Sequence, residues 1–137
     1  MNGPSRYVLD ASVAVNSVRP HEPGSARSQA FLTPLLRGQA SIVVPVIFPI
    51  EIASALARGN MDPAKIRAIV AAFLASATQL AIGPRASRGI LAVVTATRLR
   101  AADAIYVWLA VKQGLPLVTL DQEIVTRAAS HCQVITP

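Results

Sequence analysis

Short apolar runs alternate with helical patterns along the 137 residues, and this alternation constrains the fold more than any other feature. The runs have the length of buried strands, and the segments between them carry the periodicity of helices. Strands are expected at residues 6–9, 41–45, 79–82, 115–120 and 132–135. Helices are expected at residues 12–18, 25–37, 47–58, 63–76, 84–98, 101–113 and 122–129. Since strands separated by helices pair in parallel, the chain predicts one α/β domain over residues 1–137, with helices on both faces of a mainly parallel sheet of four to five strands.

Local capping signals set several helix boundaries. Asp62 followed by Pro63 has the form of an N-cap and a first-turn proline. Gly59 and Gly114 are placed to end helices, and Ser12 is expected to cap the first one.

Four of the seven acidic residues interrupt strongly apolar segments. Asp10 and Asp121 each follow an expected strand directly, Glu51 lies in the helix after the second strand, and Asp103 lies in the first turn of a later helix. Acids are rarely buried unless they are paired or bound to metal. Ligands of parallel sheets bind beyond the carboxyl ends of the strands, an edge that all four acids can reach. The sequence therefore predicts a shared carboxylate pocket and, with it, a metal ion.

Several classes of protein and site are excluded or disfavoured. No run of about 18 or more apolar residues occurs, so no membrane span is expected, and the N-terminus lacks the layout of a signal peptide. The single cysteine, Cys132, allows no internal disulfide or cysteine-based zinc site and favours a reducing cytoplasm. His21 and His131 form no recognisable ligand pair, and no Ser-His-Asp, Cys-His or Walker-type pattern is present.

The net charge of +6 leaves two interpretations open. If the four acids share one pocket, thirteen Lys and Arg face three remaining acids, a net of +10 over the rest of the surface. Such a surface attracts a polyanion. The other interpretation is that the excess of arginine serves only to keep the chain soluble, since 53% of its residues are apolar.

The segments around the acids resemble the PIN domain. They are Tyr7-Val8-Leu9-Asp10-Ala11-Ser12-Val13, a helical Glu51 about forty residues later, Asp103-Ala104-Ile105-Tyr106, and Leu117-Val118-Thr119-Leu120-Asp121. The resemblance spans nearly the whole chain in the expected order, and within the family the chain is similar to VapC-type ribonuclease toxins. It implies a three-layer α/β/α sandwich.

The resemblance also implies a site and its chemistry. Asp10, Glu51, Asp103 and Asp121 correspond to the acidic quartet that binds Mg²⁺ or Mn²⁺ and cleaves RNA, leaving 5′-phosphate and 3′-hydroxyl ends. The three aspartates are expected as principal metal ligands, direct or through water, and Glu51 as a ligand or as the group that orients the attacking water. Ser12 and Thr119 match hydroxyl positions that support such a site.

Elementary electrostatics fits this assignment. Mg²⁺ prefers oxygen ligands. Two carboxylates about 4 Å apart repel by roughly 4 kcal/mol at an effective dielectric of 20. A four-acid pocket without a cation is therefore expected to raise at least one pKa.

Some residues keep two interpretations. Glu123 either binds a second metal through water or stabilises a helix dipole. Asp103 is the acid best placed to be a helix cap instead of a ligand. Tyr106 and Trp108 are expected in the core or in a subunit contact rather than stacked on bases.

The resemblance names partners as well: an RNA substrate, a cognate antitoxin lying across the active-site groove, and a second copy in a homodimer or higher toxin–antitoxin assembly. The alternative function is a catalytically silent PIN-fold module that binds RNA or protein, which the retention of all four acids disfavours. A phosphoacceptor domain is set aside because the only lysines, Lys65 and Lys112, are expected within helices.

Overall fold

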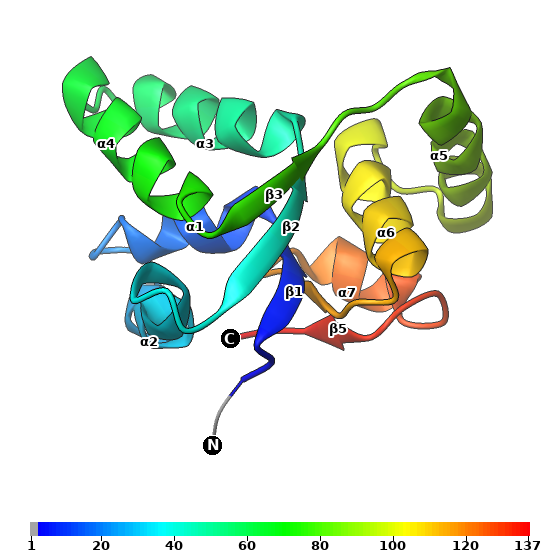
Figure 1. The fold of residues 1–137 in the computed structure, drawn as a ribbon, viewed down its shortest axis with the longest axis horizontal. Coiled ribbons are helices and arrows are strands. Elements are labelled where there is room, and N and C mark those ends of the chain that lie inside the picture. Colours follow the sequence, from blue (N-terminus) through cyan, green and yellow to red (C-terminus); the bar gives the residue numbers. More distant parts are fainter. Residues whose placement is uncertain (1–2) are drawn as a thin grey trace.

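The computed structural model describes residues 3–137, in which five parallel strands form one sheet and seven helices surround it (Figure 1). Met1 and Asn2, part of the expected domain, lie outside the described residues. The strands are β1 (Arg6–Leu9), β2 (Ser41–Pro45), β3 (Ala77–Leu80), β4 (Leu117–Val118) and β5 (Val134–Ile135). The helices are α1 (Ala11–Ser17), α2 (Ser25–Leu36), α3 (Ile47–Arg58), α4 (Pro63–Leu74), α5 (Pro84–Thr97), α6 (Ala101–Gln113) and α7 (Gln122–Ala128).

The strand order is β3-β2-β1-β4-β5, and every neighbouring pair is parallel. Helices α1 to α4 lie on one side of the sheet and α5 to α7 on the other (Figure 1). Helix α3 packs on β2 and α4 on β3, while α6 packs against β1, β2 and β4. This arrangement confirms the expected α/β/α sandwich and its parallel sheet.

The core lies where the central strands meet both helical layers. Val8 and Leu9 of β1, Val44 of β2 and Leu117 of β4 are fully buried. A strand covered on both faces reads as a continuous apolar run, and burying each such side chain contributes about 1.5–3 kcal/mol. The central strands are thus held rigidly, and the polar residues that follow them are fixed at their carboxyl ends.

Several boundaries differ from the expected ones. Helix α4 ends earlier than expected, and the Ser76 carbonyl already accepts from the Ile42 N–H at 3.0 Å, so β3 begins at Ala77 instead of residue 79. Strand β4 is limited to two residues because Pro116 has no N–H and the Leu120 N–H donates to the Ser12 hydroxyl instead of to a strand. The closing strand β5 is also shorter than expected, covering Val134–Ile135.

The cap expected of Ser12 is wrong. Helix α1 begins at Ala11, with Asp10 at the N-cap position, so Ser12 lies inside the first turn. Its hydroxyl donates to Asp10 Oδ2 rather than accepting from a helix N–H. Two other signals are confirmed: Asp62 accepts from the Lys65 N–H at 3.2 Å as the N-cap of α4, and Gly114 ends α6 with φ +62.

None of the helices within residues 3–137 combines the length and the apolar character needed to span a bilayer.

Candidate functional site

All four acids singled out from the sequence line one cavity at the carboxyl ends of β1 and β4. Its volume is about 370 Å³. The lining residues are Asp10, Ala11, Ser12, Val15, Arg19, Glu22, Glu51, Ala55, Asp103 and Asp121. Asp10 follows β1 and Asp121 lies shortly after β4, while α3 and α6 bring Glu51 and Asp103 to the same edge. The sheet thus joins residues that are up to 111 positions apart.

Asp10 is buried and held by two hydroxyl groups. Ser12 Oγ and Thr119 Oγ1 each donate to Asp10 Oδ2 at 2.7 Å. Burial raises the pKa of Asp10, the two hydroxyl bonds lower it, and the charge of Asp121 raises it further. The net direction is upward, which means that the buried negative charge costs free energy in the fold.

The same two hydroxyls accept backbone N–H groups from the chain after β4. Thr119 Oγ1 accepts from the Asp121 N–H at 3.0 Å, and Ser12 Oγ accepts from the Leu120 N–H at 3.2 Å. The hydroxyls therefore couple the orientation of Asp10 to the position of Asp121.

Asp121 is the N-cap of α7. Its Oδ1 accepts from the N–H groups of Glu123 at 2.8 Å and Ile124 at 3.3 Å. One carboxylate oxygen is thus fixed by the helix terminus, and the side chain still lines the cavity.

Glu51 is positioned by a tyrosine from the opposite layer. The buried Tyr106 hydroxyl of α6 donates to Glu51 Oε1 at 2.6 Å. Burial raises the pKa of Glu51, and the hydrogen bond from Tyr106 lowers it. Tyr106 is in the core, as expected, but sequence reasoning missed that its hydroxyl serves the site.

Asp103 carries the clearest sign of crowded charge. Burial, followed by repulsion from Asp121, Asp10, Glu51 and Glu123, raises its pKa to about 6. The expectation that Asp103 is the best helix cap among the four cavity acids is wrong, since Arg100 occupies the N-cap position of α6 and Asp121 is the one of the four whose side chain caps a helix.

Glu123 does not line the carboxylate cavity. It lies in the first turn of α7, with its Oε1 3.4 Å from Arg127 Nε. This placement favours the helix-dipole interpretation over the metal-binding one.

Two charged residues that sequence reasoning did not assign also reach the cavity. Arg19 and Glu22 follow α1, and Arg19 Nη1 lies 3.0 Å from Glu22 Oε2. The available sequence signal was an Arg and a Glu three positions apart directly after a helix whose last residues, Asn16 and Ser17, are polar.

The donor set fits a hard divalent cation. Four carboxylates converge on a cavity, and raised pKa values at Asp10, Glu51 and Asp103 show that added positive charge would stabilise them. In the part of the chain described, no three His, Cys, Asp or Glu side chains are grouped closely enough to hold a metal ion by themselves. The case for a hard cation therefore rests on the chemistry of the donors, since carboxylate oxygens are the ligands that Mg²⁺ prefers.

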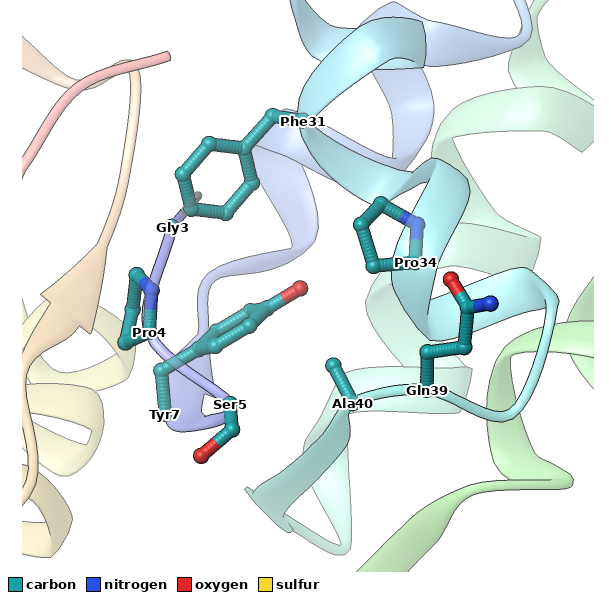
Figure 2. Close-up of a pocket in the computed structure, with 8 residues that line it drawn as sticks. All are labelled: Gly3, Pro4, Ser5, Tyr7, Phe31, Pro34, Gln39 and Ala40. Carbon is teal, nitrogen blue, oxygen red and sulfur yellow. The ribbon is translucent and has the colours of Figure 1, made fainter. Parts of the chain in front are cut away.

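A second cavity, of about 250 Å³, lies at the opposite end of β1 (Figure 2). Its lining residues are Gly3, Pro4, Ser5, Tyr7, Phe31, Pro34, Gln39 and Ala40. The buried Tyr7 hydroxyl has no hydrogen-bond partner within residues 3–137, and burial raises its pKa to about 12. The ring packs edge-to-face on Phe31, with centroids 5.4 Å apart, so it ties the start of β1 to α2.

Several solved structures share this fold at low sequence identity. VapBC2 from Rickettsia felis, bound to a DNA fragment from its promoter, aligns over 96% of this chain and 98% of its own, at 12% identity and a TM-score of 0.72. PAE2754 from Pyrobaculum aerophilum aligns over 96% and 90%, at 22% identity and a TM-score of 0.70. FitAcB from Neisseria gonorrhoeae aligns over 94% and 96%, at 18% identity and a TM-score of 0.69. At these identities the likeness establishes the fold.

No curated protein sequence matches the chain. The sequence model of the PIN domain matches residues 7–129, which include all four acids of the cavity. The chain belongs to the PIN domain family.

Proposed function

We propose that the protein is a metal-dependent endoribonuclease that acts as the toxin of a toxin–antitoxin pair. The observation that carries this proposal is the cavity lined by Asp10, Glu51, Asp103 and Asp121. The fold supports it, since a toxin–antitoxin complex from Klebsiella pneumoniae includes a chain that shares that fold.

The proposed roles follow from the geometry of the side chains. Asp10, with one oxygen held by Ser12 and Thr119, would present its carboxylate to Mg²⁺ or Mn²⁺ together with Asp103 and Asp121. A bound divalent ion supplies an activated water and neutralises charge on the phosphoryl oxygens. Cation binding would relieve the repulsion from the neighbouring acids that, after burial, raises the pKa of Asp103.

Glu51 is proposed to orient the attacking water or to accept its proton. Its Oε1 is occupied by the Tyr106 hydroxyl, which fixes the direction of the other oxygen. A raised pKa makes this carboxylate a better proton acceptor than an ordinary Glu.

The proposed partners are an RNA substrate, a cognate antitoxin and a second copy of the chain, all acting in the cytoplasm. Several large apolar side chains are exposed, and their burial against another chain would stabilise an assembly. They are Leu36, Val46, Ile50, Leu91 and Val111. We also propose that residues 1–137 act as one domain.

The test is cleavage of total cellular RNA by the purified protein with Mg²⁺ or Mn²⁺, and again with EDTA. Asp10→Asn is the active-site variant. Asp62→Asn is the matched control, because Asp62 caps α4 away from the cavity and Asn caps equally well. The proposal expects discrete cuts that disappear in EDTA and in Asp10→Asn but persist in Asp62→Asn. Absence of cutting by folded, metal-loaded, antitoxin-free protein would favour the silent binding module instead.

A further inference from the structure

Arg19 is held at the edge of the carboxylate cavity by two hydrogen bonds. Its Nη1 donates to Glu22 Oε2 at 3.0 Å, and its Nη2 donates to the Ala55 carbonyl of α3 at 2.9 Å. Its side chain is 35% exposed. These bonds use two of the five N–H donors of a guanidinium, so the group is fixed in place and still reachable from solvent.

A buried polar network stands behind this pair. Asn16 Nδ2 donates to Glu22 Oε1 at 3.2 Å and to the Pro23 carbonyl at 3.1 Å. Ser28 Oγ of α2 donates to Asn16 Oδ1 at 2.7 Å. Asn16 is 5% exposed and Ser28 is fully buried. Since buried polar side chains are costly unless satisfied, a network of this kind holds Glu22, and through it Arg19, far more firmly than a solvated ion pair would be held.

Arg19 brings a positive charge to a cavity that is otherwise lined by acids and uncharged residues. Among the residues that line it, Arg19 is the single basic side chain, facing five acids. A phosphodiester that approaches these acids is repelled by them unless a cation receives it. A guanidinium with fixed orientation suits phosphate oxygens better than a mobile ammonium does.

We propose that Arg19 binds a non-bridging oxygen of the RNA backbone and thereby positions the strand over the carboxylates, with Glu22 as its positioning residue. This inference rests on the proposed function, since it assigns the substrate contact of the same site. The alternative is that the network has only a structural role and fixes the segment after α1 against α3.

The test separates binding from cleavage. In the Asp10→Asn background, which is not expected to cut, binding of a short fluorescein-labelled single-stranded RNA is measured by anisotropy over a series of salt concentrations with Mg²⁺ present. Arg19→Gln and Arg19→Met both remove the charge, and the second retains much of the aliphatic stem. Arg37→Gln, at the exposed C-cap of α2, is the matched control.

The proposal expects both Arg19 variants to bind RNA about ten- to a hundredfold more weakly, the loss of one charge-assisted contact. It also expects the slope of log affinity against log salt to fall by about 0.7, the value for one phosphate contact on a single strand. The control should bind within about twofold of the background protein. Folded Arg19 variants with an unchanged affinity and salt slope would overturn the inference, even if their thermal stability fell.

Failure of the proposed function gives a different result. If the wild-type protein binds RNA in an Arg19-dependent way but never cleaves it, the phosphate contact of Arg19 stands and the proposed nuclease activity is wrong. If the Arg19→Gln variant cleaves RNA normally, the nuclease activity stands and the proposed role of Arg19 is wrong.

Discussion

Replacing Asp103 with Asn should stabilise the metal-free protein at alkaline pH. The pKa of Asp103 rises from 3.8 to about 6, through burial and then repulsion from the other acids. A shift of about two units corresponds to about 3 kcal/mol of destabilisation when the group is ionised. Because Asp103 is only partly buried, solvent screening reduces the expected gain to about 1–2 kcal/mol.

The direction of the expected stability difference between Asp103→Asn and the wild type follows from the pH at which Asp103 ionises. Between pH 3.8 and about 6 the folded protein binds more protons at Asp103 than the unfolded chain does. The stability contributed by protonated Asp103 is therefore fully present below the lower value and is lost as pH rises through the higher one. Asp103→Asn should match the wild type near pH 4 and exceed it by about 1–2 kcal/mol near pH 8, or by roughly 4–8 °C in Tm.

The assay is denaturant unfolding with EDTA at both pH values, with Asp62→Asn as the control. Asp62 caps α4 outside the cavity, so this variant should show no gain that depends on pH. Added Mg²⁺ should stabilise the wild type more than Asp103→Asn, since the variant has lost a ligand. An equal stability difference between the wild type and Asp103→Asn at the two pH values would refute the claim that charge crowding raises this pKa.

Substitutions at three further residues test the contacts around the cavity. Tyr106→Phe removes the hydrogen bond that lowers the pKa of Glu51, so the acidic limb of the pH–rate profile should move to higher pH and denaturant unfolding should show a loss of about 1–3 kcal/mol. Asp121→Asn can still cap α7 and should retain stability while losing Mn²⁺ affinity by titration, whereas Asp121→Ala should also lose about 1 kcal/mol of stability. Thr119→Val removes a donor to Asp10 and should weaken Mn²⁺ binding about 10–100-fold in the same titration; unchanged affinity would show that the hydroxyl is dispensable.

The sequence predicted the elements of the fold well because each has a local cause. The apolar run of β2 and the Asp62-Pro63 start of α4 are signals within a few residues, and the structure has both elements there. The exact limits of β3 and β4 were missed because they depend on residues far away in the sequence, in β2 for β3 and at Ser12 of α1 for β4. The Ile42 N–H donates to the Ser76 carbonyl, and no local sequence pattern around residue 76 predicts this hydrogen bond.

The acids of the site were predictable for a related reason. A carboxylate at or just beyond the carboxyl end of a buried strand lies at the edge of the sheet, and Asp10, directly after β1, and Asp121, three residues after β4, are of this kind. Tyr106 was not predictable as a partner of Glu51, because the hydrogen bond joins residues 55 positions apart from opposite layers. The contact between Arg19 and the Ala55 carbonyl, 36 positions apart, was invisible for the same reason.

The hydroxyl contacts of Asp10 indicate which charge state the fold is built around. Ser12 and Thr119 each accept a backbone N–H, from Leu120 and Asp121. Each hydroxyl proton is therefore directed to Asp10 Oδ2, which receives two donors and has no need of a proton of its own. The contacts favour a carboxylate, whereas burial and the neighbouring acids disfavour it. Arg19, the one basic side chain among the residues that line the cavity, is already paired with Glu22, so we propose that the opposing charge comes from a bound cation. A divalent ion at the carboxylates would offset part of their negative charge, and a phosphate could then reach the remaining donors of Arg19 with less repulsion.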